Sequence, residues 1–381
     1  MELVVVADYG RVTVVDLELG VEKTLVDRGG SWPAANGASL AIPLDRSATE
    51  GSAVVRVLAR GDGATEIPAT RLPAGFAIAP LLTHYVYCSA DTVAVVQPSG
   101  TGGLQLATWS PGDPDATPLL VAAPLFLALD RESGRIAVHG GQGSGGSLLV
   151  FDRRESEPCF RIEGAGGFGA PAFLGQGDTV AWAEPIEGGR IRLRAARPGC
   201  NVSFSGPRLP GPVRFLSGTS GPEVLIAASE PGVDGFARIL AWNPADDRVR
   251  QIAEGQLLAA WAHEAGGKLR LAVARPGYFD DGRLLMEFLD GEGRMLGRLE
   301  PVVLSAQERL AMAFFDQFGR SHDPWSRDGE WFALSGRLLG DGPHDLFGPP
   351  GLQHVLGVRV GEHGGPLRWV RLASGSFGRF L

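Results

Sequence analysis

Short apolar runs recur along this chain, each bounded by Gly, Pro, Asp or Ser. Eight of them are four to eight residues long and rich in Val, Ile, Leu and Ala, which is typical of β-strands. Their apolar and polar positions alternate poorly, so we expect strands that are covered on both faces. The runs occupy residues 4–8, 39–45, 92–97, 135–140, 179–184, 223–229, 269–275 and 331–336.

A second set of segments follows the first set, one for one. Its members alternate in part and then end in polar turns of Asp, Gly and Pro. Their starts are separated by 42, 50, 44, 43, 46, 47 and 72 residues. This spacing indicates a repeated unit of about 40–50 residues. The members begin at Val12, Val54, Leu104, Leu148, Ile191, Ala237, Leu284 and Leu356.

A third set precedes the first set in seven of the units. The first unit has no such segment before it, but residues 377–381 (FGRFL) match the pattern. We therefore expect residues 377–381 to pair with residues 4–7 and to join the two ends of the chain. The seven members lie at 32–36, 84–89, 126–130, 171–175, 213–217, 258–262 and 323–327.

These three sets together predict an all-β protein. Four-stranded antiparallel units of this size cannot bury both faces alone, whereas a radial arrangement packs each sheet on its neighbours. We predict a single β-propeller domain over residues 1–381, closed by the C-terminal strand on the N-terminal blade. Eight four-stranded blades are expected, or seven if one unit is degenerate. The rival architecture is a two-domain β-sandwich.

The interval before the last unit is longer than the others and indicates an insertion. Ser305-Ala306-Gln307-Glu308 matches a capping box, which predicts a short helix from Ala306 to about Met312. A second long connection, 339–353, is rich in Gly and Pro and is expected to be a loop.

The segment Trp325-Ser326-Arg327-Asp328-Gly329 resembles the W-S-P-D-G turn of TolB-like, WD40-like bacterial propellers. The stretch from Phe314 to Ser326 also looks like a signature of a subgroup of these proteins. The resemblance implies that Trp325 ends an innermost strand, that Asp328-Gly329 makes the hairpin turn, and that the ring binds proteins without catalysis. The periplasmic location and partners of TolB itself are not carried over, because neither an export signal nor an additional N-terminal domain is found.

Composition narrows the function classes. The chain has 35 basic and 43 acidic residues, a net charge of −8, and only two Lys, which argues against binding nucleic acid. The longest apolar stretch, 119–129, is too short to cross a bilayer, and the N-terminus lacks a basic segment before its apolar run. The sequence thus predicts a cytoplasmic, soluble protein with no membrane insertion.

Cys88 and Cys159 lie in or beside apolar runs and are expected to be buried thiols.

No catalytic residue, cofactor or metal site is predicted. Two G-x-G-x-x-G matches precede strand-like runs rather than helices and are interpreted as hairpin loops. The candidate ligand- or partner-binding residues lie within the insertion. A carboxylate near His322 could orient the imidazole, but the favoured interpretation is that His322 ties the insertion to the next strand. The candidates are Phe315, Asp316, Gln317, Arg320 and His322.

The leading functional hypothesis is a non-catalytic scaffold whose partner is another protein. The partner would meet one face of the ring or the long connections 299–325 and 339–353. A hydrolase or lyase acting on a carbohydrate or small metabolite in the central funnel is an alternative, because propeller loops gather around one axis. Binding of a small ligand without turnover is a second alternative.

Overall fold

The structure is a computed structural model, and it describes most of the chain. The described residues are 1–30, 33–35, 39–43, 53–59, 64–68, 85–88, 93–98, 104–109, 117–119, 124–130, 133–140, 146–152, 155–164, 170–175, 177–200, 203–211, 213–219, 221–230, 232–276, 283–313, 323–338, 353–361 and 366–381.

Six antiparallel sheets of the described chain have four strands each. The first has the order β3-β2-β1-β31, and the other five follow chain order. Their strands are β1 (Glu2–Val6), β2 (Val12–Asp16), β3 (Val21–Val26) and β31 (Phe377–Phe380); β4 (Ala34–Ala35), β5 (Ser39–Pro43), β6 (Ala53–Ala59) and β7 (Ala64–Pro68); β8 (Tyr85–Cys88), β9 (Val93–Pro98), β10 (Leu104–Trp109) and β11 (Thr117–Pro118); β12 (Pro124–Leu129), β13 (Ile136–Gly140), β14 (Ser147–Phe151) and β15 (Phe160–Glu163); β16 (Ala172–Leu174), β17 (Thr179–Ile186), β18 (Arg190–Ala196) and β19 (Ser203–Leu209); β20 (Val213–Gly218), β21 (Val224–Ser229), β22 (Phe236–Asn243) and β23 (Arg248–Gln256).

A further sheet has seven strands, β24 to β30 in chain order. Helix α1 (Ala306–Ala313) lies in the chain between β27 and β28, and two 3-10 turns occupy Asp8–Gly10 and Glu187–Gly189. The strands are β24 (Ala259–Ala265), β25 (Lys268–Pro276), β26 (Arg283–Asp290), β27 (Met295–Leu304), β28 (Trp331–Leu338), β29 (His354–Arg359) and β30 (Val370–Ser374).

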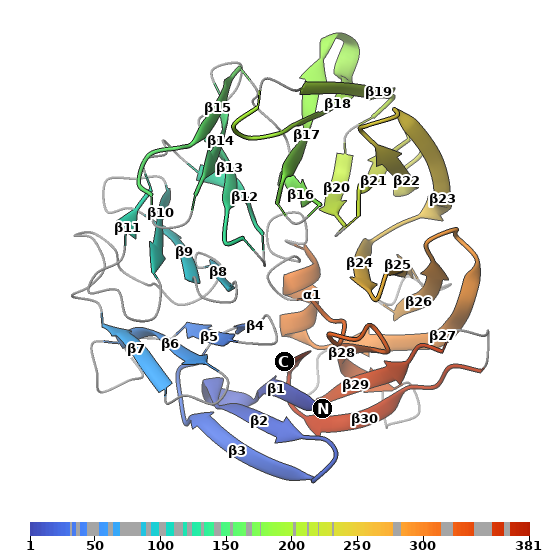
Figure 1. Cartoon of the computed structure of the whole chain (residues 1–381). Coiled ribbons are helices and arrows are strands. Elements are labelled where there is room, and N and C mark those ends of the chain that lie inside the picture. The colour runs from blue at the N-terminus through green and yellow to red at the C-terminus, as the bar shows by residue number, and fades with distance from the viewer. Residues whose placement is uncertain are drawn as a thin grey trace.

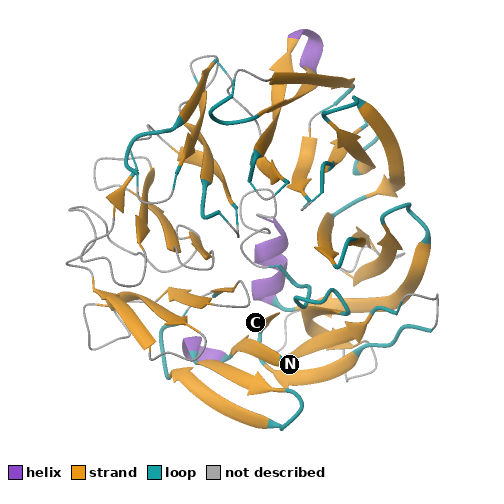
Figure 2. Ribbon diagram, in the orientation of Figure 1, coloured by secondary structure: helices purple, strands orange, loops and turns teal. Residues whose placement is uncertain are grey.

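The sheets stand side by side around a common centre in the order of the chain (Figure 1). Strands make up nearly all of the regular structure, and α1 lies at the centre of the ring of sheets (Figure 2). This all-β arrangement of antiparallel, four-stranded sheets agrees with the predicted propeller class.

The three predicted sets of strands correspond to the three inner strands of each unit. The first set forms β1, β5, β9, β13, β17, β21, β25 and β28, and the second forms the strand that follows each of these. The fourth strand of each unit was expected, but its position in the sequence was not assigned. In β3 and β23 more than half of the positions are exposed, so the apolar pattern that marks the inner strands is absent there.

The core consists of layers between neighbouring sheets. All five residues of β13 are buried, as are Val224 to Ala228 in β21, which explains the poor alternation along these strands. One buried cluster joins Leu148 and Val150 to Trp182 of the next sheet, and another joins Leu3 to Val355. Each sheet therefore buries its faces against its neighbours.

The expected pairing between the two ends of the chain is observed. Strand β31 lies antiparallel to β1, with Phe377 opposite Val6 and Phe380 opposite Leu3. Beyond the strand ends, the amide of Leu381 donates to the carbonyl of Glu2 at 3.1 Å. The last residues of the chain thus supply the innermost strand of the first sheet.

The innermost strand of the last unit is interrupted. Residues Val302–Leu304 pair with one end of β28, and Trp325 forms a bridge with Phe332 at its other end. The amide of Ser305 donates to the carbonyl of Ser335, and the amide of Ala333 donates to the carbonyl of Pro324. The chain thus leaves the strand after Ser305, enters α1 near the centre of the ring, and returns at Pro324 (Figure 1).

The expectation of buried thiols is wrong for Cys159, which is exposed, as is Cys200. Cys159 directly precedes β15, an outermost strand whose residues alternate between half-buried and exposed. The neighbouring apolar residue Phe160 is itself only half-buried, so the local apolar run did not indicate a core position.

Candidate functional site

Helix α1 is attached to the C-terminal strand by a buried ion pair. The Arg379 guanidinium makes two contacts with the Glu308 carboxylate, Nη2 to Oε1 at 2.6 Å and Nη1 to Oε2 at 3.0 Å. The same guanidinium lies 4.2 Å from the ring centroid of Phe377. The insertion therefore contacts the strand that joins the two ends of the chain.

The predicted helix is present, but only half of its capping box forms. The Glu308 amide donates to Ser305 Oγ at 3.0 Å, as the motif requires. The Glu308 carboxylate does not return to the Ser305 amide. It accepts instead from the amide of Ser335 at 3.0 Å and from Arg379, so the tertiary contacts replace the local one.

The turn between Trp325 and Trp331 forms a compact hydrogen-bonded loop. Ser326 Oγ donates to Asp328 Oδ1 at 2.6 Å, and the Glu330 amide donates to the same oxygen at 2.9 Å. The Gly329 amide donates to the Ser326 carbonyl, and Gly329 has φ +68°, a conformation that favours glycine. This confirms the turn that the sequence resemblance implied.

Trp325 fixes this turn to the sheet. Its side chain is 3% exposed, its indole N–H donates to the Trp261 carbonyl at 3.2 Å, and its ring meets Phe288 and Phe332 edge to face. Arg270 of β25 donates to the carbonyls of Gly329 and Val360 from the other side. The turn is thus held between β24, β25 and the last unit.

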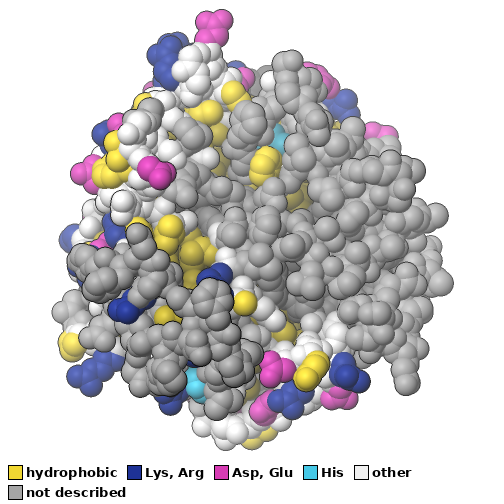
Figure 3. Space-filling model, turned by 180° about the vertical axis from the view of Figure 1, so that it is seen from behind, with side chains coloured by type: hydrophobic (Ala, Val, Ile, Leu, Met, Phe, Trp, Pro, Cys, Tyr) yellow, Lys and Arg dark blue, Asp and Glu magenta, His cyan; other side chains and the backbone are white. Residues whose placement is uncertain are grey.

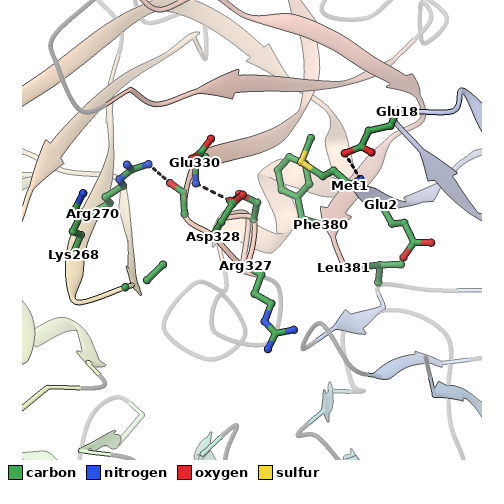
Figure 4. A pocket seen from close by; sticks show the side chains of 14 residues that line it. Met1, Glu2, Glu18, Lys268, Arg270, Arg327, Asp328, Glu330, Phe380 and Leu381 are labelled. Carbon is green, nitrogen blue, oxygen red and sulfur yellow. Dashed lines mark hydrogen bonds and ion pairs between the residues drawn. The ribbon is translucent and has the colours of Figure 1, made fainter. Parts of the chain in front are cut away.

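A pocket of about 820 Å³ opens between this turn and the two ends of the chain. In Figure 4 the Arg327 side chain extends away from Asp328, while Met1, Glu18 and Leu381 line the opposite side. The Met1 amino group donates to Glu18 at 3.1 Å. Half of the lining residues are charged, and both signs are present.

A second pocket of about 520 Å³ shares Lys268 and Arg270 with the first. In this pocket the Arg250 guanidinium donates two hydrogen bonds to the Glu223 carboxylate, from Nη2 at 2.6 Å and from Nε at 3.2 Å. It also donates to the Gly291 carbonyl. We call the two pockets together the charged band. The ion pairs Met1–Glu18 and Arg250–Glu223 each lie within one sheet. The hydrogen bond from Arg250 to the Gly291 carbonyl links two neighbouring sheets.

Asp328 is ionised in this setting. Burial alone raises the pKa of its carboxyl, but hydrogen bonds from Ser326 Oγ and the Glu330 amide, together with the charge of His263, hold the pKa below its ordinary value. The carboxylate therefore acts as an acceptor that shapes the turn, not as an acid near neutral pH.

Charges are also mixed elsewhere on the surface. Figure 3, which shows the molecule from behind, has Lys or Arg and Asp or Glu side chains interspersed around the rim of the described residues. Such a surface suits contacts that are selected by a pattern of charges rather than by a field of one sign.

All five candidates predicted from the sequence lie outside the described residues. They fall in the segment between Ala313, the end of α1, and Asp323, where the chain returns to the sheet. They are Phe315, Asp316, Gln317, Arg320 and His322.

The charged band was not predicted from the sequence. Arg327 and Asp328 belong to the recognised turn, but Lys268 and Glu18 reach the pocket from distant parts of the chain. Side chains at hairpin turns carry no periodic signal. The packing of the first sheet on the seven-stranded sheet and the pairing of β31 with β1 bring these groups close together.

Among the described residues, no group of three or more His, Cys, Asp or Glu side chains is placed to hold a metal ion. Among the described helices, none is long and apolar enough to cross a membrane.

Neither a family model nor a curated protein matches this sequence. Solved structures do match. A prolyl endopeptidase has a TM-score of 0.55 at 12% identity, over 90% of this chain and 49% of that chain. A puromycin hydrolase mutant has a TM-score of 0.50 at 13% identity, over 91% of this chain and 54% of that chain.

A TolB from Agrobacterium tumefaciens is also similar, with a TM-score of 0.44 at 13% identity, over 67% of this chain and 90% of that chain. The chain spans about half the length of the two peptidases. At these identities the likeness to the peptidases establishes the propeller class of fold and nothing about activity.

Proposed function

We propose that this chain is an eight-bladed, closed propeller that binds another protein through the charged band. Eight units are supported by the eight second strands and by the interrupted inner strand at Trp325, which completes the last unit. Closure is supported by the pairing of β31 with β1. Non-catalytic binding follows the resemblance of the Trp325–Gly329 turn to TolB-like propellers.

The observation that carries the proposal is the wall of the larger pocket. Small-molecule sites are lined mostly by apolar side chains with few polar groups. Half of the residues that line this pocket are instead charged, and several of them are held in place by hydrogen bonds. Preorganised charges of both signs give a protein partner specificity and fast association.

The partner can be captured at the pocket itself. A photo-crosslinking amino acid replaces Arg327 in one variant and Lys23, which is exposed on β3, in a matched control. We expect one protein of the source cell to crosslink at position 327 and not at position 23. The purified partner is then titrated against the wild type and Arg327→Glu, which we expect to bind at least about tenfold more weakly.

Two results would reject the scaffold proposal. One is the same set of crosslinks at both positions, which indicates nonspecific contact. The other is an equal Kd for the wild type and Arg327→Glu, which places the interface elsewhere. Folding of each variant is checked first by circular dichroism.

An enzyme is the second candidate, favoured by the likeness to two peptidases. The screen uses fluorogenic peptides, oligosaccharides and small esters with the purified chain. Turnover that is lost in His322→Ala would support this candidate. Absence of turnover with every substrate counts against it.

A small ligand remains the third candidate, since about 820 Å³ lies within the usual range of ligand pockets. Thermal shifts against a metabolite collection test it. A hit supports this candidate only if Arg327→Ala abolishes the shift.

A further inference from the structure

His263 of β24 faces two hydrogen-bond acceptors. Its Nδ1 lies 3.1 Å from Oδ2 of Asp323, and its Nε2 lies 3.2 Å from the main-chain oxygen of Arg327. A neutral imidazole has one N–H and can donate to only one of them, whereas an imidazolium donates to both. The arrangement is therefore complete only when His263 carries a proton on each nitrogen.

The ring has little freedom to turn away from these acceptors. Its side chain is 12% exposed and is stacked on Trp325 with 6.2 Å between ring centroids. On another side, a Cβ placed on Gly329 would lie 3.1 Å from its Cδ2. Asp323 is also fixed, since its other oxygen accepts from the Trp325 amide at 3.0 Å.

Among the described residues, three charged groups face His263. Asp323 is hydrogen-bonded to it, and Asp328 is close enough for the charge of His263 to lower the Asp328 pKa. Arg270 lies opposite His263 in the β24–β25 pairing, but its guanidinium donates to two carbonyls. The adjacent Glu264 accepts instead from the amide of Gly221.

We propose that His263 is a proton-dependent clamp that holds the turn Trp325–Gly329 against β24. With a proton taken from solvent, the imidazolium bonds Asp323 and the Arg327 carbonyl. When it releases that proton, a lone pair on Nε2 faces the Arg327 oxygen and this bond is lost. Arg327 and Asp328, at the rim of the pocket, are then held less firmly.

This inference goes beyond the proposed function, because the clamp needs no partner. It is tested on the full chain alone by hydrogen exchange and mass spectrometry at pH 5.5 and pH 8.0, corrected for the intrinsic pH dependence of exchange. We expect peptides covering Asp323–Trp331 to exchange at least about tenfold faster at pH 8.0, the size of one hydrogen bond to a charged group. Peptides from β21 are the internal reference and should not change.

The matched variants are His263→Gln and His354→Gln. The first removes the clamp and should abolish the pH dependence in Asp323–Trp331, whereas the second removes a histidine on β29 and should leave it intact. Equal corrected exchange of the wild type at both pH values would overturn the proposal. So would an unchanged pH dependence in His263→Gln.

A second measurement covers the case in which His263→Gln does not fold. In Asp323→Asn the carboxylate that favours the imidazolium is gone, so the ratio of exchange rates between the two pH values should fall below that of the wild type. An unchanged ratio rejects the role of Asp323. In addition, the ring-proton NMR signal of His263 should differ between pH 5.5 and pH 8.0, and an identical signal at the two pH values contradicts the clamp.

Discussion

Arg379 on β31 forms a two-point ion pair with Glu308 on α1, and the two side chains are 3% and 1% exposed. The pair joins the helix at the centre of the ring to the strand that brings the ends of the chain together. Ser305 Oγ adds a hydrogen bond to the Ser376 carbonyl at 2.5 Å. The insertion is therefore part of the framework and not only an appendage of the last unit.

We expect Glu308→Ala to lower the free energy of unfolding by about 3–5 kcal/mol, because it leaves the Arg379 charge buried and unpaired. The double variant Glu308→Leu with Arg379→Met should lose less unfolding free energy than the sum of the losses in Glu308→Leu and Arg379→Met alone. Urea denaturation of all these variants measures the losses. The control is Arg161→Ala, whose ion pair with Glu163 is exposed and should contribute less than about 1 kcal/mol. Equal losses at Glu308 and Arg161 would contradict the framework role.

Gly218 marks a close approach between two sheets. A Cβ there would overlap the main-chain oxygen of Phe173 on β16. Gly218→Ala should destabilise the fold by about 1–3 kcal/mol or more, because backbone cannot move aside as a flexible side chain can. Gly221→Ala is the matched control, since its new methyl would meet only ordinary contacts at 3.6 Å and beyond. Thermal denaturation of the two variants should separate them, and similar melting temperatures would refute the close approach.

Gly329 and Gly266 both have a positive φ, +68° and +56°, but only Gly329 has a neighbour at its vacant Cβ position. Gly266→Ala should cost about 1–2 kcal/mol from backbone strain alone. Gly329→Ala should cost more, because the methyl also presses on His263. A loss at Gly329 no greater than that at Gly266 would show that the imidazole does not pack on the turn. Urea denaturation at pH 7 gives both values.

Asp328 should make the fold sensitive to acid. Its pKa in the folded chain lies below the ordinary value of 3.8, so its hydrogen bonds stabilise the fold above that pH and are lost as the pH falls through the folded value. Asp328→Asn should cost about 1 kcal/mol or less at pH 7, since the group is largely exposed, and almost nothing near pH 2. Denaturation curves of the wild type and Asp328→Asn between pH 7 and pH 2 test whether the difference in stability shrinks as the pH falls. A difference that grows toward low pH would contradict the prediction.

The sequence predicted the inner strands well because they are short, apolar and bounded by turn residues. The pairing of 377–381 with the first strand followed from counting one missing segment. The outer strands were missed for a physical reason. Strand β3 has four exposed residues in succession, Val21 to Thr24, so burial imposes no pattern on it.

The site was much harder to predict than the fold. Helix α1 could be placed from Ser305 and Glu308, but the pairing of Glu308 with Arg379 spans 71 residues and has no local signature. The same holds for His263 and Asp323, which are 60 residues apart. Local chemistry suggested His322 and Asp316 as candidates, whereas the described pocket is assembled from turns that lie far apart in the sequence.

The unbroken main-chain ladder from β24 to β30 has a mechanical consequence. Within the described chain, Val302–Leu304 bonds to β28 and joins the last two units in one sheet, while the other units belong to separate sheets. Between the β16–β19 and β20–β23 sheets, the Gly175 amide donates to the carbonyls of Thr219 and Gly221 in addition to the side-chain contacts. A stretched ladder resists shear better than an apolar seam does. Under a pulling force the last two units should rupture together in one step, and the molecule should split first at a seam between other units.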